Sequence, residues 1–246
     1  MSDALLPPLL FVILVFFSAF QQTLSGFGFA LLLMPIATII FGLRSASSLV
    51  ALIAITLYTI NLFRYKHALN ARQVLRLGTA AAVGVPIGVW ALINLNEVIV
   101  KLLLGLLLIG YALYSLANPV GLRVGSERWG YLAGFLGGCL GGAYNVPGPP
   151  IIIYGSMRAW EKDEFRAILQ AIFLVSGSLT VAIHLIAGRV TSDVLILYAF
   201  SLPALLIAIW GAGQVDTRVD RSRFRIMVTA MVLVMGVSTI LELVGK

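Results

Sequence analysis

GFLGGCLGGAYNVPGPPIII, residues 134–153, is the stretch that decides the fold of this chain. It is apolar enough for the interior of a lipid bilayer, yet it is rich in residues that break helices. Irregular backbone persists at membrane depth only where it is buried in protein or lines a wet cavity. Gly/Pro-interrupted hydrophobic segments are also the best sequence pointer to the binding site of a transport protein. The stretch therefore predicts a membrane transporter whose binding site lies at a broken helix.

A weaker version of the same pattern lies near the start of the chain. Ser25-Gly26-Phe27-Gly28 interrupts an apolar run, and Pro35 follows it. Two broken segments, one in each half of the chain, suggest a protein built from two related halves.

The composition places the chain in the membrane. It has 246 residues, of which 60% are hydrophobic and 11% charged, whereas soluble domains average about 25% charged residues. The net charge of +7 does not indicate a nucleic-acid partner, because the basic residues lie in short loops between apolar runs. With Cys139 as the one cysteine, the chain can form neither an internal disulfide framework nor a cysteine metal site.

Ten apolar runs are candidates for membrane helices, since a span needs roughly 17–25 residues. The sixth and seventh runs are short, and the sequence leaves open whether they are tilted spans or one re-entrant hairpin. The first and second runs leave the same choice. The ten runs are 5–24, 27–42, 45–63, 74–94, 98–117, 129–143, 147–157, 166–187, 192–212 and 224–244.

The basic residues orient the runs, because cytoplasmic loops carry an excess of Lys and Arg. Placing the two most basic loops inside puts 13 of the 17 Lys and Arg residues on the cytoplasmic side. We therefore expect a multi-pass protein of the cell inner membrane. The loops expected in the cytoplasm are 64–76, 118–128, 158–166 and 213–225.

The chain reads as one membrane domain, 1–246, that contains an internal repeat. Residues 5–117 and 129–244 each hold five runs, and an odd number of spans makes the two copies face opposite ways. Trp90 then falls on Trp210, and Thr56 on Ser176. The predicted fold is thus an all-α polytopic membrane protein of two inverted repeats with broken or re-entrant Gly/Pro-rich hairpins. Such repeats place the substrate site at their interface near the membrane midplane.

The broken segments supply most of the candidate binding groups. Glycine lets backbone approach a ligand, proline ends a helix, and each new helix N-terminus favours an anion. The alternative for the glycines is close helix packing through small residues. Amide and hydroxyl side chains near the breaks and near the predicted midplane complete the set. The predicted substrate-binding residues are Gln21, Gln22, Ser25, Gly26, Gly28, Thr56, Gly141, Gly142, Asn145, Pro147, Gly148, Gln170 and Ser176.

Three ionisable residues lie near the ends of predicted spans. His184 invites a role in proton coupling, but its distance from the start of its helix predicts an interfacial, water-reached histidine. Arg166 could draw anions toward the site, although an interfacial anchor is the plainer interpretation for it and for Arg44. No Asp or Glu lies mid-span, which favours an anion or a neutral polar solute over a cation.

Two motifs resemble the TauE/SafE sulfite-exporter family, also called the toluene-sulfonate uptake permease family. They are Gly-Phe-Gly-Phe-Ala-Leu-Leu-Leu-Met-Pro at 26–35 and Gly-Pro-Pro-Ile-Ile-Ile-Tyr at 148–154, the latter followed by Lys-Asp-Glu-Phe-Arg-Ala at 162–167. The chain departs from the family pattern at Asn145-Val146-Pro147, where glycines are more usual. The resemblance implies an inner-membrane transporter of sulfite, sulfonates or sulfoacetate. It places the family's hairpin residues at Gly26, Gly28, Pro35, Gly141, Gly142, Gly148, Pro149 and Pro150.

The expectation is therefore a secondary transporter of small sulfur-containing anions that works by alternating access. An anion channel, or a carrier of other small carboxylates or neutral solutes, is the alternative. No catalytic motif, metal site or cofactor site is expected. The expected partners are a small anionic substrate and the lipid bilayer, with a coupling ion such as the proton and a homo-oligomer as further possibilities.

Overall fold

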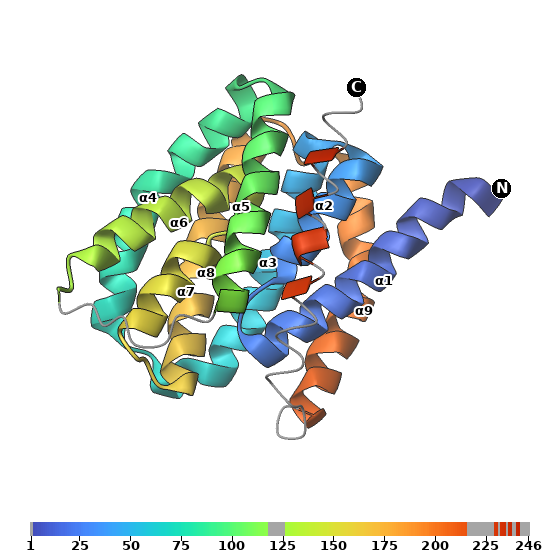
Figure 1. Ribbon diagram of the computed structural model, residues 1–246. Coiled ribbons are helices and arrows are strands. Elements are labelled where there is room, and N and C mark those ends of the chain that lie inside the picture. The colour runs from blue at the N-terminus through green and yellow to red at the C-terminus, as the bar shows by residue number, and fades with distance from the viewer. Residues whose placement is uncertain are drawn as a thin grey trace.

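The computed structural model describes residues 2–117 and 126–215, together with 229–230, 232–234, 236–237 and 240–241. Within these residues the chain is helical and contains no strand (Figure 1). The predicted tenth span at 224–244 and the basic loops at 118–128 and 213–225 fall mostly outside the described residues. The helices are α1 (Ser2–Ser25), α2 (Phe29–Phe41), α3 (Leu43–Tyr65), α4 (Ala71–Asn94), α5 (Glu97–Ala117), α6 (Trp129–Tyr144), α7 (Gly148–Met157), α8 (Lys162–Ile186) and α9 (Ser192–Val215), with the 3₁₀ turn η1 (Lys66–Ala68) after α3.

Six of the described helices are long and apolar enough to cross a membrane, namely α1, α3, α4, α5, α8 and α9. The other three are too short for a full span: α2 has 13 residues, α6 has 16 and α7 has 10. A span needs about 17 residues or more, at 1.5 Å of rise each. The prediction of an all-α multi-pass membrane protein is confirmed.

Helices α3 and α8 lie at the centre of the bundle and run antiparallel. Near the start of α3, Ser47 Oγ lies 3.2 Å from His184 Nε2 near the end of α8. At the opposite end of the pair, Arg166 Nη1 donates a hydrogen bond of 3.1 Å to Tyr65 OH. Helices α4 and α6 pack together on one side of this pair, and α1 packs with α9 on the other (Figure 1).

Helices α1 and α2 form one antiparallel hairpin, and α6 and α7 form another. In the first hairpin the rings of Phe11 and Phe41 meet with centroids 5.2 Å apart, at the end of the bundle where α3 begins. In the second, Glu127 just before α6 lies 3.7 Å from Arg158 just after α7, at the end where α8 begins. Because α3 and α8 are antiparallel, the two hairpins open toward opposite ends of the bundle. Whether each hairpin is re-entrant stays a prediction.

The pairing of helices has the form that a duplicated chain would produce. If each helix is matched with the one five places later, the α1–α9 pair corresponds to α6–α4, and α3–α9 corresponds to α8–α4. The central α3–α8 pair corresponds to itself. Trp90 on α4 and Trp210 on α9, which the sequence aligned, both lie on the exposed surface of the bundle. This pairing supports the inverted repeat, which stays a prediction.

A row of glycines brings α6 against α4. Gly130, Gly134, Gly138 and Gly142 recur every fourth residue, so they share one face of α6. A Cβ on Gly138 would lie 2.7 Å from the Cα of Ala81. Small residues at this spacing allow the close backbone approach that stabilises helix pairs in membranes.

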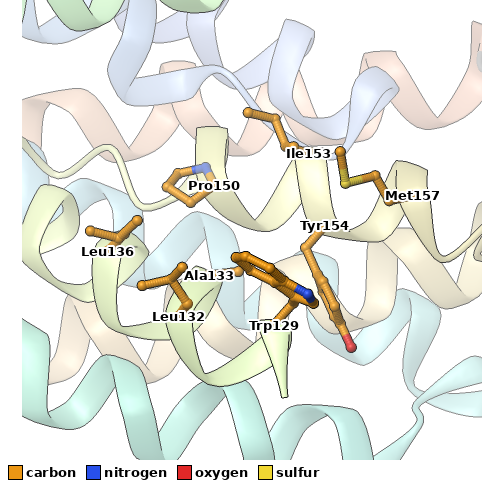
Figure 2. Close-up of a pocket in the computed structure, with 8 residues that line it drawn as sticks. All are labelled: Trp129, Leu132, Ala133, Leu136, Pro150, Ile153, Tyr154 and Met157. Atoms are coloured by element: carbon orange, nitrogen blue, oxygen red, sulfur yellow. The ribbon is translucent and has the colours of Figure 1, made fainter. Parts of the chain in front are cut away.

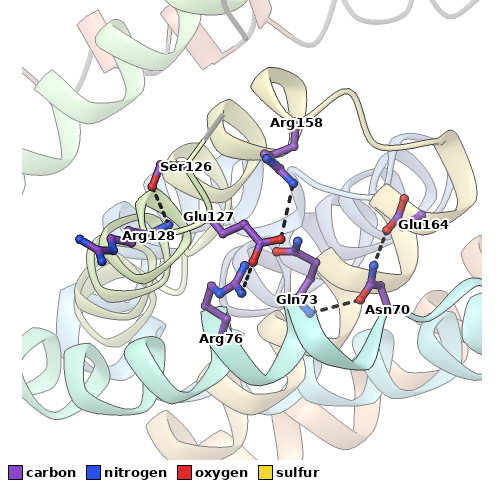
Figure 3. Close-up of polar contacts among 8 residues, drawn as sticks. All are labelled: Asn70, Gln73, Arg76, Ser126, Glu127, Arg128, Arg158 and Glu164. Atoms are coloured by element: carbon purple, nitrogen blue, oxygen red, sulfur yellow. Dashed lines mark hydrogen bonds and ion pairs between the residues drawn. The ribbon is translucent and has the colours of Figure 1, made fainter. Parts of the chain in front are cut away.

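Polar contacts tie the second hairpin to its neighbours where α4 and α8 begin (Figure 3). The Glu127 carboxylate accepts a bond of 2.5 Å from Arg76 Nη2, which holds the pKa of the Glu127 carboxyl below its usual value. Glu164 accepts a bond of 2.9 Å from Asn70, whose side chain also caps the start of α4. This cluster fixes both ends of the second hairpin at one end of the bundle.

Candidate functional site

The first break lies at residues 26–28, between α1 and α2. Gly26 and Gly28 have φ of 89° and 105°, values that residues with a Cβ rarely adopt. Ser25 stabilises the turn locally, since its Oγ accepts from Phe27 N–H at 3.2 Å and donates to Phe27 O at 2.6 Å. The glycines are therefore required by backbone conformation, as the sequence predicted for a broken helix.

Gln22 closes the first break from within. Its Oε1 accepts from Phe29 N–H at 2.9 Å, which caps the first turn of α2, and its Nε2 donates to Gly26 O at 3.1 Å. The side chain is 1% exposed. A buried amide that satisfies one backbone donor and one backbone acceptor holds the two helix ends at a fixed distance from each other.

Helix α8 holds the carbonyl side of the first break. Gln170 Nε2 donates to Gly26 O at 2.7 Å, and Arg166 Nη2 donates to Leu24 O. Arg166 is 3% exposed, and its side chain lies against Gly26. A guanidinium at the last carbonyls of α1 also pairs a positive charge with the negative end of the helix dipole.

The interpretation of Arg166 as an interfacial anchor is thus wrong. The length of the helix gives the depth of a residue, but it does not say whether another segment covers it. Here the first break lies over Arg166.

The second break lies at residues 145–147, between α6 and α7. Asn145 is left-handed, with φ of 58°, and its N–H returns to Gly141 O at 2.9 Å, which ends α6. Its side chain reaches α3, where Nδ2 donates to Ser47 O at 2.9 Å and lies 3.3 Å from Ser47 Oγ. Pro147 then precedes α7, whose first residue is Gly148.

The two breaks meet at one cavity near the middle of α3 and α8, which we call the break cavity. Residues 27–31 line it from the first hairpin and residues 145–148 from the second. Gln22 of α1, Tyr58 of α3 and Phe173 of α8 complete the wall, and in this conformation the free space has room for about one water molecule. Residues more than 110 positions apart in sequence therefore form a single candidate site.

The first hairpin brings the N-terminus of a helix to the break cavity. The first turn of a helix has N–H groups with no partner inside the helix. In α2 these belong to Phe29, which Gln22 caps, and to Ala30 and Leu31, which line the cavity. In α7 the prolines at 149 and 150 have no N–H. The second break therefore offers fewer backbone N–H donors than the first.

A second small cavity, again with room for about one water molecule, adjoins the break cavity and shares Tyr58, Asn145, Pro147 and Phe173 with it. Gly141 and Ser176 lie in its wall. Ser176 Oγ is buried and has no hydrogen-bond partner among the described residues. A buried hydroxyl without a protein partner fits a bound water or ligand at this position.

Two residues predicted for the site lie elsewhere. Thr56 Oγ1 is 2.8 Å from Tyr198 OH, so it faces α9. Gly142 faces α4, where an added Cβ would lie 2.9 Å from Val89 N. Gly142 therefore allows close helix packing, which was the alternative to binding, because it belongs to the row of glycines on the face of α6 that contacts α4.

Gln21 lies beside the first break without lining either cavity. Its side chain packs against Gly28, where an added Cβ would meet Oε1 at 2.5 Å. Its Nε2 donates to Ser25 Oγ at 3.0 Å. Gln21 therefore supports the shape of the break.

Sequence reasoning missed the aromatic pair in the wall of the break cavity. The rings of Tyr58 and Phe173 are 5.2 Å apart and come from the two central helices. Apolar spans are full of aromatic residues, so neither one is marked by its neighbours. The available signal was that each lies in the interior of the long helix that follows a broken hairpin.

The expectation of a water-reached His184 is also wrong. Its side chain is 0% exposed, and it contacts Ser47 of α3 at 3.2 Å. Ser47 was missed as well, since a serine in the first turn of a helix looks like an ordinary terminal residue. Both belong to a polar chain that reaches the second break.

A larger groove between α6 and α7 is almost wholly apolar. Figure 2 shows Trp129, Leu132 and Leu136 of α6 beside Pro150, Ile153 and Met157 of α7. The side-chain donors in this wall are the indole N–H of Trp129 and the hydroxyl of Tyr154, so it offers an anion few hydrogen bonds. Among the described residues there is also no group of three His, Cys, Asp or Glu side chains that could hold a metal ion. The break cavity therefore remains the candidate site.

Replacing Gln22 by leucine is expected to lower both stability and anion binding. The change removes the cap on Phe29 N–H and the bond to Gly26 O, each worth about 0.5–1.5 kcal/mol. We expect the melting temperature to fall by several degrees and the stabilisation by sulfite or a sulfonate to disappear in thermal-shift assays. Gln214→Leu, the same change at an exposed position of α9, is the control. A Gln22→Leu protein that melts and responds to anions like the control would contradict this role.

Two sequence comparisons found proteins similar to this chain. The model of a family described as Sulfite exporter TauE/SafE matches residues 11–239. A protein of Cupriavidus necator (strain H16), named probable sulfite/organosulfonate exporter TauE, is 27% identical over 219 residues, which cover 84% of this chain and 83% of that protein. No solved structure matches the chain.

Proposed function

The chain belongs to the TauE/SafE sulfite exporter family, and from that membership we propose that it carries small sulfur-containing anions across the inner membrane. Sulfite and organosulfonates are the proposed substrates, as the name of the Cupriavidus necator relative indicates for that protein. The observation that carries the proposal is the break cavity, where the first turn of α2 meets the second break.

The electrostatics of the cavity favour a negative solute. Ala30 and Leu31, which line it, belong to the first turn of α2, where the helix dipole is positive and N–H groups have no partner inside the helix. None of the described residues that line it is acidic. Arg166, which lies against Gly26, is the one buried Lys or Arg among the described residues. The proposed pose directs the oxyanion to the α2 N-terminus and any organic substituent to Tyr58 and Phe173.

The two hairpins suggest how access could alternate. Each enters from its own end of the bundle, and both tips border the same cavity. A movement of one repeat against the other would open the cavity to one side while the tip on the other side stays closed, as in other inverted-repeat transporters. In this proposal the loops at 64–76, 118–128, 158–166 and 213–225 face the cytoplasm, because they hold most of the basic residues.

Counterflow in reconstituted vesicles tests the proposal. Vesicles loaded with unlabelled sulfite or an alkanesulfonate should transiently accumulate labelled anion from outside, since a carrier exchanges one substrate for another. Thermal-shift assays should show stabilisation by these anions, because a ligand that binds the folded state stabilises it by mass action. Rapid flux without transient accumulation would identify the channel alternative. Counterflow of acetate or of a neutral solute, with no response to sulfite or sulfonates, would identify the other carrier.

A further inference from the structure

We propose that His184 is the proton-coupling residue of this transporter and that Ser47 links it to the second break. The inference rests on the proposed transport function and names the ion that accompanies the anion. It starts from a buried contact between His184 and Ser47, two residues that do not line the break cavity. His184 Nε2 lies 3.2 Å from Ser47 Oγ, and Asn145 Nδ2 lies 3.3 Å from the same oxygen.

His184 is isolated from solvent by protein atoms. Its side chain is 0% exposed, and Nδ1 has no hydrogen-bond partner among the described residues. Buried ring nitrogens normally find a partner, so an unpaired one needs an explanation. A histidine that gains and loses a proton during a transport cycle provides one, because its partner can change between states. The imidazole is also the side chain whose charge ordinarily changes between pH 5 and 8.

The chain of contacts leads from His184 to the anion. Asn145 lines the break cavity, and its Nδ2 also donates to Ser47 O at 2.9 Å. Ser47 is therefore held between the histidine and the second break. Two hydrogen-bonding contacts separate the imidazole from a residue in the wall of the proposed anion site.

Protonation would change the contact between His184 and Ser47. With a proton on Nδ1 alone, neutral His184 accepts the hydrogen of the Ser47 hydroxyl at Nε2. The imidazolium carries hydrogen on both nitrogens, so Nε2 must donate and Ser47 Oγ must accept. The hydroxyl hydrogen of Ser47 must then rotate away from His184. Because Asn145 Nδ2 contacts the same Ser47 Oγ, this rotation changes the contact between Ser47 and Asn145. The proton that binds to the ring thus alters the hydrogen bonding of the second break.

The charges around this end of α8 link the proton to the anion. Two cationic residues lie at this end of α8: Arg189, whose backbone N–H donates to His184 O at 2.9 Å, and Arg44 near the start of α3. Asp193 at the start of α9 is exposed, and Asn145 and Ser47 are neutral. The arginines oppose another positive charge here, whereas an anion beside Asn145 attracts one. Anion and proton therefore help each other to bind, and this coupling is reciprocal.

Transport driven by a pH gradient tests the inference. The probe is labelled methanesulfonate, a strong-acid anion whose own charge does not change over the pH range of histidine. In wild-type vesicles, an acidic donor side should drive accumulation of the anion. His184→Gln keeps a hydrogen-bonding group next to Ser47 but cannot titrate. We expect it to lose pH-driven accumulation by about fivefold or more, the low end of typical coupling between sites, while counterflow at equal pH persists.

His67→Gln is the matched control, because His67 is exposed and is the other histidine of the chain. It should accumulate methanesulfonate as the wild type does. Purified His67→Gln protein should also take up protons from a weakly buffered solution when methanesulfonate binds, whereas the His67→Gln/His184→Gln protein should take up none. This binding measurement decides the matter if His184→Gln proves too unstable to transport.

The outcomes separate this inference from the proposed function. Wild-type counterflow without any response to a pH gradient would overturn the coupling and leave the transporter intact. Undiminished pH-driven accumulation by His184→Gln, or the absence of proton uptake by His67→Gln, would overturn the role of His184. Failure of the wild type to show counterflow would instead contradict the proposed function.

Discussion

Replacing Gly138 by leucine is expected to prevent the bundle from assembling. A Cβ at this position would lie 2.7 Å from the Cα of Ala81 and 2.9 Å from its carbonyl carbon. These are backbone atoms of α4, so no side-chain rotation relieves the overlap. Extra carbon atoms in a well-packed interior cost about 1–3 kcal/mol and sometimes more. Here they would separate two helices along their whole contact.

Gly110→Leu is the matched control, since among the described residues no atom outside its own helix lies within 4 Å of a Cβ built at Gly110 of α5. Both variants should be expressed and purified in detergent and compared by size-exclusion chromatography and thermal melting. We expect Gly110→Leu to give a wild-type profile and Gly138→Leu to give aggregate or no folded protein. Equal melting temperatures for the two variants would show that α4 and α6 do not approach as described.

Replacing Arg166 by methionine is expected to abolish transport. The change removes the charged donor to Leu24 O and Tyr65 OH, and hydrogen bonds to charged groups are worth about 1.5–3 kcal/mol each. It also removes the buried positive charge beside the first break. A loss of about 1.4 kcal/mol or more in anion binding lowers affinity tenfold or more. Counterflow of labelled sulfite should fall to the level of empty vesicles.

Arg72→Met makes the same change at an exposed position in the first turn of α4 and should retain counterflow. Arg166→Lys keeps the charge but lacks the planar fork that reaches two acceptors. We expect it to bind anions more weakly than the wild type and more tightly than Arg166→Met. If Arg166→Met transports like Arg72→Met, the guanidinium has no part in the function of the first break.

The sequence predicted the helices and their interruptions closely. The runs expected at 129–143 and 147–157 correspond to α6 at Trp129–Tyr144 and α7 at Gly148–Met157. The first break was expected at Gly26–Gly28, and both of these glycines have positive φ. Glycine and proline mark such positions because their backbone effects are local and do not depend on which neighbours surround them.

The lateral positions of side chains were beyond the reach of the sequence. Arg166 and His184 were placed at the interface from their distance along α8, yet both are buried. Their burial is produced by α3 and by the first break, whose placement depends on how the hairpins pack. Gly142 was assigned to the site although it faces α4. The spacing of residues along a helix does not say which neighbouring helix each face contacts.

The backbone N–H groups proposed to bind the anion were the part of the site that the sequence could predict least. Ala30 and Leu31 contribute backbone N–H groups, which every non-proline residue has. Ala30 and Leu31 are distinguished by their position in the first turn of α2, directly after the hairpin turn and the cap that Gln22 places on Phe29. A site made of backbone donors therefore becomes visible only once the two breaks are seen to meet.

Locating a bound anion tests the central claim most directly. Selenite resembles sulfite in shape and charge, and selenium scatters X-rays anomalously, so its position can be read from a crystal of the wild-type protein. We predict an anomalous peak in the break cavity, between residues 28–31 of the first hairpin and residues 145–148 of the second. A peak in the apolar groove between α6 and α7, or only among the basic residues at the ends of the bundle, would contradict the account.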